Sequence, residues 1–181
     1  QVRPGDLFLA LPGEKYDGRQ FIAQAVANGA AAVVAEAPVA DAARAIAVPL
    51  VELPALQARA GFLAARFYRH PSHAMQVVGI TGTNGKTTTS RIIAQLTRAL
   101  GKPCGVIGTL GATLADDVAA ASNTTPDAVS LQQQLAQWLA QGVRAVSMEV
   151  SSHALEQGRV NGVEFATAIY TNLSHDHLDY H

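Results

Sequence analysis

The fold of this chain is decided by the stretch Val77-Val78-Gly79-Ile80-Thr81-Gly82-Thr83-Asn84-Gly85-Lys86-Thr87-Thr88-Thr89. Its apolar start indicates a buried strand, its glycines a tight turn, and the residues after Lys86 a helix. A turn with little side-chain bulk lets backbone N–H groups point at one phosphate, and the helix that follows adds its positive end. Lys86 would then reach the terminal phosphates and Thr87 a Mg²⁺ ion. The stretch predicts a P-loop that binds a nucleotide triphosphate.

The match to the strict P-loop pattern is incomplete. That pattern has a glycine five positions before Gly85, where this chain has Ile80, so that Gly79 and Gly82 frame the loop instead. The alternative is an ordinary glycine-rich turn between a strand and a helix. The order of strand, loop and helix favours the P-loop, because phosphate binding needs the elements in that order.

Composition excludes several classes of protein. The chain has 181 residues, 15% of them charged, and a net charge of −1, which argues against a nucleic-acid or membrane-surface partner. It contains no run of about 18 apolar residues, so we expect no membrane span. The single cysteine, Cys104, cannot form an internal disulfide and lies in an apolar run. We expect a buried thiol in a cytoplasmic protein.

Strand and helix patterns alternate along the chain. The first part predicts strands at 5–11, 31–35 and 49–53 and helices at 18–28 and 54–68. The second part predicts a helix after the P-loop, with Ile92, Ile93, Leu96 and Leu100 at helical spacing on its apolar face. A strand at 104–108 and an irregular stretch to Thr125 follow. The next helix runs to Gly142 with a core stripe of Leu131, Leu135, Trp138 and Leu139, and strands are predicted at 145–150 and 163–171. This alternation predicts an α/β fold with a mostly parallel sheet and helices on both faces. The break at His70-Pro71-Ser72-His73 predicts two domains, 1–73 and 74–181.

Polar residues follow several of the predicted strands. Ligands of parallel sheets bind beyond the carboxyl ends of the strands, where the P-loop, Glu149 and the segment after Thr171 would meet. A carboxylate such as Glu149 is costly to bury unless it meets a cation, and Mg²⁺ shared with Thr87 would supply one. An arginine partner for Glu149 is the alternative. The segment Ser174-His175-Asp176-His177-Leu178-Asp179 suits a metal or phosphate site or, alternatively, an exposed loop.

The chain resembles the Mur ligases over its whole length. The motifs that carry the resemblance are Gly82-Thr83-Asn84-Gly85-Lys86-Thr87-Thr88, Asn123-Thr124-Thr125-Pro126, Met148-Glu149-Val150-Ser151-Ser152-His153-Ala154-Leu155, Gly158-Arg159-Val160 and Thr171-Asn172-Leu173-Ser174-His175-Asp176-His177-Leu178-Asp179-Tyr180-His181. In the first domain they are Gly5-Asp6-Leu7-Phe8 and Asp17-Gly18-Arg19.

The resemblance implies an ATP-driven amide ligase of peptidoglycan synthesis. It implies a small uridine-binding α/β domain, followed by a truncated P-loop ATPase domain with a mostly parallel sheet. The substrate would be UDP-MurNAc-L-Ala-D-Glu, whose D-Glu carboxylate becomes an acyl phosphate. The amine of a diamino acid then attacks it; we favour meso-diaminopimelate and keep L-lysine as the alternative. We expect a monomer with no nucleic-acid or membrane partner.

The resemblance also assigns roles to residues of this chain. ATP would be bound by Gly82, Thr83, Asn84, Gly85, Lys86, Thr87 and Thr88. Mg²⁺ would be held by Thr87, Glu149 and His177, and the catalytic residues would be Lys86, Glu149 and His177. The nucleotide-sugar dipeptide would be bound by Asn123, Thr124, Thr125, Ser151, Gln157 and Arg159, with Glu14, Lys15 and Tyr16 on the uridine side.

Three family features lie outside these 181 residues. They are an Asp-Ser-Arg motif expected before Gln1, and, after His181, a carbamylated lysine and a C-terminal domain that selects the amino acid. We therefore expect residues 1–181 alone not to complete the reaction. A non-ligase P-loop NTPase would need an aspartate where Glu149 stands. Folylpolyglutamate synthetase shares the loop but is not expected to carry the Ser-His-Asp-His-Leu-Asp-Tyr-His motif, and a pure binding role is a third alternative.

Overall fold

The computed structural model describes residues 2–13, 16–114, 117–119 and 124–174. The chain divides into two compact units, Gln1–Ala60 and Gly61–His181. This division falls inside a helix, α3 (Leu56–Phe67). The boundary at residues 73 and 74 stays our proposal for the domains.

The first unit is built on a three-stranded parallel sheet in the order β1-β2-β3. The strands are β1 (Leu7–Ala10), β2 (Ala32–Glu36) and β3 (Leu50–Leu53), and the helices are η1 (Gly18–Phe21), α1 (Ile22–Ala27) and α2 (Asp41–Arg44). In the register, Leu7 lies opposite Ala32 and Val33 opposite Leu50. The core of this unit consists of Ala10, Ile22, Val33, Ala35 and Val39.

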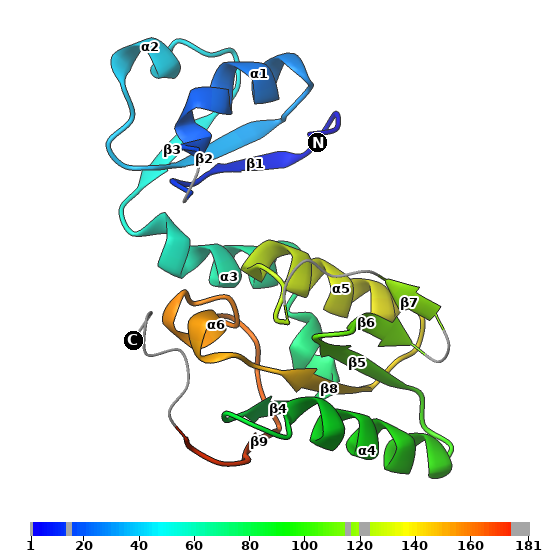
Figure 1. Ribbon diagram of the computed structural model, residues 1–181. Coiled ribbons are helices and arrows are strands. Elements are labelled where there is room, and N and C mark those ends of the chain that lie inside the picture. The colour runs from blue at the N-terminus through cyan, green and yellow to red at the C-terminus, as the bar shows by residue number, and fades with distance from the viewer. Residues whose placement is uncertain (1, 14–15, 115–116, 120–123, 175–181) are drawn as a thin grey trace. The chain divides into compact units, whose positions relative to one another are not determined.

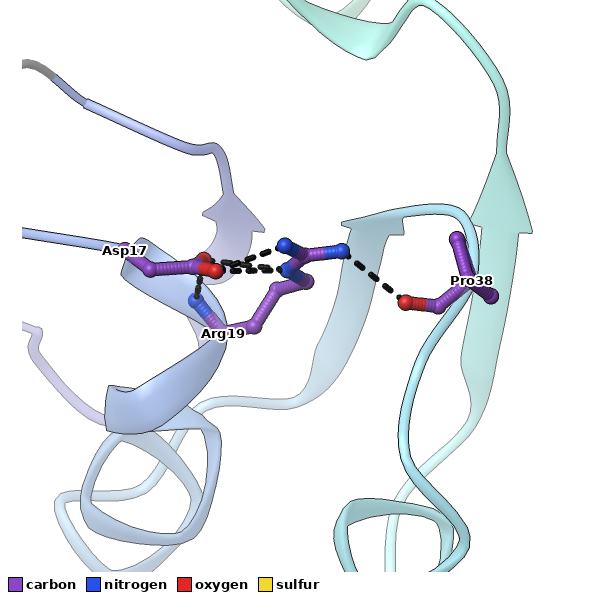
Figure 2. A network of polar contacts seen from close by, with 3 residues as sticks. All are labelled: Asp17, Arg19 and Pro38. Atoms are coloured by element: carbon purple, nitrogen blue, oxygen red, sulfur yellow. Dashed lines mark hydrogen bonds and ion pairs between the residues drawn. The ribbon is translucent and has the colours of Figure 1, made fainter.

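The motif Asp17-Gly18-Arg19 has a structural role in this unit (Figure 2). Asp17 caps η1 by accepting a bond from the Arg19 backbone N–H, and it forms an ion pair with the Arg19 guanidinium. Arg19 Nη1 also donates to the carbonyl of Pro38 at 2.9 Å. A Cβ at Gly18 would lie 2.5 Å from the Leu11 carbonyl oxygen, so only glycine fits. The motif therefore fastens the start of η1 to the loop after β2.

The second unit contains a six-stranded sheet in the order β7-β6-β5-β8-β4-β9 (Figure 1). Its strands are β4 (Gln76–Thr81), β5 (Cys104–Gly108), β6 (Gly111–Leu114), β7 (Asp117–Ala119), β8 (Ala145–Glu149) and β9 (Thr167–Tyr170). Its helices after α3 are η2 (Pro71–Ala74), α4 (Lys86–Ala99), α5 (Ala128–Ala140) and α6 (Ser152–Glu156). Strands β5, β8, β4 and β9 run parallel, which confirms the predicted α/β fold with a mostly parallel sheet.

Helices cover both faces of this sheet, with α4 on one face and α5 on the other (Figure 1). The α5 side forms the larger core, in which the predicted stripe residues Leu131, Leu135 and Trp138 are buried. Trp138 lies directly over β5, because a Cβ at Gly105 would collide with its ring. The α4 side is a smaller cluster of Ala94, Cys104 and Val106. The predictions of a core Trp138 and of a buried Cys104 are confirmed.

The predicted apolar face of α4 is wrong. Ile92, Leu96 and Leu100 are exposed, and the buried residues of the helix are Ser90 and Ala94. The helix begins at the P-loop and lies close to β5 and β8, and small side chains permit that approach. Periodicity alone located the helix but selected the wrong face.

Several other elements and boundaries differ from the sequence prediction. The stretch after β5, predicted to be irregular, contains the antiparallel hairpin of β6 and β7. The helix predicted from Pro54 begins at Leu56, and the strand predicted from 163 begins at Thr167. The break at residues 70–73 contains η2, whose buried Ser72 accepts a bond from the Glu164 N–H at 3.0 Å. Local turn signals did not reveal the contact between Ser72 and Glu164.

Candidate functional site

The P-loop joins the end of β4 to the start of α4. Its glycines adopt backbone conformations that other residues rarely reach, with φ of +122° at Gly82 and +88° at Gly85. A Cβ at Gly82 would also collide with Thr171 Oγ1. The sequence around Lys86 therefore forms a loop that only glycine permits, at the N-terminus of a long helix. Such a helix start favours an anion.

Lys86 lies over this loop. Its Nζ donates to the carbonyl oxygens of Gly82 at 2.6 Å and Thr83 at 3.0 Å. These bonds hold the ammonium group beside the helix N-terminus, where two sources of positive potential add. A hollow of about 270 Å³ adjoins the loop; its lining residues include Gly82, Thr83, Lys86, Ser151 and Tyr170. The arrangement suits a phosphate chain.

The segment after β9 fastens the loop from its other side. Asn172 Oδ1 accepts from the Asn84 N–H at 3.0 Å, and Asn172 Nδ2 donates to the Asn84 carbonyl at 2.9 Å. The Asn172 carbonyl accepts from the Thr83 N–H at 3.0 Å, and the Ser174 N–H donates to Thr83 Oγ1 at 3.0 Å. The loop conformation thus depends on residues far along the chain. Asn172 was not among the predicted site residues.

Glu149 ends β8 and is almost completely buried, with 2% of its surface exposed. It accepts from the Thr87 hydroxyl at 3.0 Å and from the N–H and hydroxyl of Thr109, each at 3.2 Å. In the described part of the chain Glu149 forms no ion pair, so the alternative of an arginine partner finds no support. A buried carboxylate with only neutral donors retains much of its cost of burial.

The same arrangement fits a magnesium ion. Glu149 and Thr87 offer hard oxygen atoms, and Mg²⁺ is commonly held by one or two carboxylates together with phosphate and water oxygens. No group of three or more His, Cys, Asp or Glu side chains suited to a metal occurs among the described residues. Phosphate oxygens, water or residues outside the described ranges would have to complete the shell.

A second set of predicted residues surrounds the backbone of Glu149. The buried Thr125 hydroxyl donates to the Glu149 carbonyl at 2.9 Å and accepts from the Ser151 N–H at 3.2 Å. Arg159 binds the Thr125 carbonyl through Nη1 at 3.1 Å and Gln157 Oε1 through Nε at 2.8 Å. Ser151 in turn caps α6. Thr125, Ser151, Gln157 and Arg159 therefore form one hydrogen-bonded group next to Glu149.

The structure brings together most of the predicted residues that it describes in the second unit. Thr124 joins them, since its hydroxyl lies 3.3 Å from that of Thr109. Thr88 is exposed on α4, and Tyr16 lies in the first unit, 70% exposed, with its ring 6.4 Å from that of Phe21. Glu14, Lys15, Asn123 and His177 lie outside the described residues.

Sequence reasoning missed Thr109 as well as Asn172. Both residues follow strands that run parallel to β4 or β8, and both therefore lie at the edge that holds the P-loop. The position of Thr109 directly after an apolar strand was a signal that could have identified it.

Two family models match the chain. The Mur ligase middle domain matches residues 80–181, and the model described as Mur ligase family, catalytic domain, matches residues 1–68. The chain belongs to the Mur ligase family. The resemblance inferred from the motifs is thereby confirmed.

Curated Mur ligases are similar to the chain over its whole length. A UDP-N-acetylmuramoyl-L-alanyl-D-glutamate–2,6-diaminopimelate ligase of Ectopseudomonas mendocina is 51% identical over 181 residues, which are 100% of this chain and 37% of that protein. The ligase of the same name from Coxiella burnetii is 50% identical, with the same coverage. The chain thus spans little more than a third of the length of these relatives.

Solved Mur ligase structures share the fold. A structure of a UDP-N-acetylmuramoyl-L-alanyl-D-glutamate–2,6-diaminopimelate ligase superposes with a TM-score of 0.83 at 36% identity, over 100% of this chain and 36% of that one. MurF from Thermotoga maritima, in complex with ADP, has a TM-score of 0.66 at 20% identity, over 99% of this chain and 37% of that one, which supports the fold alone. No helix among the described residues of this Mur ligase chain is long and apolar enough to cross a membrane.

Proposed function

We propose that the protein containing this chain is an ATP-dependent ligase that adds a diamino acid to UDP-MurNAc-L-Ala-D-Glu. The observation that carries the proposal is the hydrogen bond of 3.0 Å from the Thr87 hydroxyl to the buried Glu149 carboxylate, beside the P-loop lysine. The roughly 50% identity to diaminopimelate ligases supports this substrate over that of folylpolyglutamate synthetase. The proposed third residue is meso-diaminopimelate.

The reaction joins a carboxylate and an amine at the expense of ATP. The γ-phosphoryl group moves to the D-Glu carboxylate, forming an acyl phosphate and ADP. The amine then attacks the acyl carbon, and phosphate leaves from the tetrahedral intermediate. Because phosphoryl transfer requires little covalent chemistry from the protein, positioned cations and N–H groups supply most of the stabilisation.

The residues of the second unit divide these tasks. Lys86 and the Gly82–Gly85 loop would hold the phosphates, and Thr87 and Glu149 would hold a Mg²⁺ ion, with His177 proposed as a further ligand. When bound, Mg²⁺ would neutralise charge on the phosphate oxygens. Thr124, Thr125, Ser151, Gln157 and Arg159 would position the acceptor peptide, with Asn123 proposed beside them. Glu14, Lys15 and Tyr16 are proposed on the uridine side.

The proposal is tested with the complete polypeptide that contains these residues. It is incubated with ATP, Mg²⁺, UDP-MurNAc-L-Ala-D-Glu and either meso-diaminopimelate or L-lysine, and products are identified by mass spectrometry. We expect the tripeptide product with diaminopimelate, and ADP released in equal amount. ADP release that does not depend on the UDP substrate would contradict the ligase assignment, and product with L-lysine alone would correct the amino acid. We propose that the enzyme acts as a cytoplasmic monomer.

A further inference from the structure

Thr109 lies in the turn between β5 and β6, and no role was predicted for it from the sequence. It follows β5, and since Gly108 pairs with Gly111, Thr109 and Leu110 form a two-residue hairpin turn. Gly108 allows this turn to approach the buried carboxylate, because a Cβ at Gly108 would collide with Glu149 Oε1. The backbone thus fixes Thr109 against Glu149.

Thr109 gives two donors to the carboxylate. Its N–H binds Oε1 and its hydroxyl binds Oε2, each at 3.2 Å, while the Thr87 hydroxyl also binds Oε2 at 3.0 Å. Donors on both oxygens restrict rotation of the carboxylate about its terminal bond. The direction in which Glu149 presents its lone pairs is therefore set in large part by Thr109.

The same hydroxyl reaches the substrate loop. A hydroxyl carries one proton, and that of Thr109 is donated to Glu149, so the Thr124 hydroxyl 3.3 Å away must be the donor in the second bond. The next residue, Thr125, binds the Glu149 carbonyl at 2.9 Å. Residues 124–125 are thus linked to Glu149 in two ways. The Thr125 hydroxyl binds the backbone carbonyl of Glu149, and the Thr124 hydroxyl is linked to the Glu149 carboxylate by way of Thr109.

We propose that Thr109 is a positioning residue that orients the Glu149 carboxylate and couples the Mg²⁺–nucleotide site to the substrate loop at Thr124. The proposal rests on the proposed ligase function. Binding of the UDP substrate beside Thr124 would then favour one orientation of Glu149 and strengthen binding of Mg²⁺ and nucleotide. By reciprocity, Mg²⁺ and nucleotide would strengthen binding of the UDP substrate by the same factor.

The test compares Thr109→Val, which removes the hydroxyl at nearly constant shape, with Thr109→Ser, which keeps it. Thr97→Val is the control, because the Thr97 hydroxyl also donates a hydrogen bond, to the Ile93 carbonyl at 2.8 Å, but lies on α4 and makes no bond to Glu149 or Thr124 among the described residues. In the complete enzyme we measure the Mg²⁺ concentration for half-maximal activity. We also measure the affinity for Mg²⁺ and a non-hydrolysable ATP analogue, with and without UDP-MurNAc-L-Ala-D-Glu.

We expect Thr109→Val to raise the half-maximal Mg²⁺ concentration about tenfold, as befits a lost hydrogen bond to a charged group. In the wild type the UDP substrate should tighten analogue binding at least about fivefold, and in Thr109→Val this factor should fall towards one. Thr109→Ser should restore both values, and Thr97→Val should change neither.

Three outcomes would overturn the inference. They are a Thr109→Val enzyme with wild-type Mg²⁺ dependence and coupling, equal losses in the valine and serine variants, or no coupling in the wild type. If Thr109→Val does not fold, Thr124→Val tests the same link from its other end, and unchanged coupling there would also overturn it. A wild-type enzyme that forms no peptide product would instead overturn the proposed function.

Discussion

At the scale of single residues, the second unit concentrates charge at Lys86 and Glu149. Lys86 is held by two loop carbonyls, and Glu149 is buried among hydroxyl and N–H donors. Under the proposed function, Lys86 would bind an anion and Glu149 a cation. Substitutions that remove either charge should therefore change chemistry more than stability.

Replacement of Lys86 by alanine in the complete enzyme should lower the rate of ADP formation at least about a hundredfold. Removal of one preorganised group that stabilises developing charge costs about 3 kcal/mol or more. Lys102→Ala is the control, since Lys102 is also a lysine but is exposed after the end of α4. The steady-state rate of ADP release is measured for both variants. Near-normal turnover of Lys86→Ala would contradict the proposal that Lys86 binds the phosphates of ATP.

Arg159 should act on the UDP substrate rather than on ATP. Its guanidinium spans the Thr125 carbonyl and Gln157 Oε1, a planar arrangement that lysine cannot reproduce. Arg159→Lys should raise the KM for UDP-MurNAc-L-Ala-D-Glu and leave the KM for ATP nearly unchanged. Arg144→Lys is the control, because Arg144 also binds backbone carbonyls, those of Leu139 and Val143. Equal changes in both KM values for Arg159→Lys would make Arg159 a structural residue.

At the scale of elements, stability comes from how each helix meets its sheet. Helix α5 packs Leu131, Leu135 and Trp138 into the larger core, and the missing side chain of Gly105 lets the indole approach β5. Helix α4 uses small residues instead, which leaves Ile92 and Leu96 in solvent. Helix α5 should therefore contribute more to the stability of the second unit than α4.

The N-cap of α5 provides a test at this scale. Asp127 Oδ1 accepts from the N–H groups of Val129 and Ser130, each at 3.0 Å. Asp127→Ala should lower the free energy of unfolding by about 1 kcal/mol, whereas Asp127→Asn, which keeps an acceptor oxygen, should cost much less. Urea titration followed by circular dichroism measures the difference. Equal losses for alanine and asparagine would show that the charge, and not the cap, stabilises the helix.

At the scale of the whole molecule, the stability of the first unit should depend on pH. In the first unit the hydrogen bond from the Arg19 side chain holds the pKa of Asp17 below its ordinary value, and Arg44 does the same for the pKa of Glu52. Carboxyl groups with lowered pKa values stabilise the folded state above their unfolded pKa values. That stability is lost as the pH falls through the folded values.

Asp17→Asn makes this pH dependence measurable. At pH 7 the variant should unfold at a lower temperature than the wild type, because its amide would lack the charge that pairs with Arg19. The difference should shrink as the pH falls below about 4, the ordinary pKa range of aspartate, because Asp17 of the unfolded wild type is protonated there and Asp17 of the folded wild type follows at lower pH. The control is Asp41→Asn, whose side chain is 97% exposed in the wild type. A difference that does not depend on pH would contradict the role of the ion pair.

Local signals were enough to predict the P-loop and the mostly parallel sheet, and the resemblance of the motifs indicated the family. Glycine positions, the lysine and strand periodicity are local signals, and the backbone conformations at Gly82 and Gly85 leave few alternatives. The predicted strands also indicated that Glu149 lies at the edge of the sheet where ligands bind, because parallel strands place their carboxyl ends together.

The contacts between distant residues became evident only from the folded structure. The face that α4 buries depends on strands distant in the chain. The bonds of Asn172 to the P-loop and of Thr109 to Glu149 likewise join residues far apart in sequence. Such pairs leave no periodic pattern, since packing space and unsatisfied donors select them only after the chain has folded. The physical reason is that the local sequence encodes backbone conformation, whereas partners depend on how the elements pack.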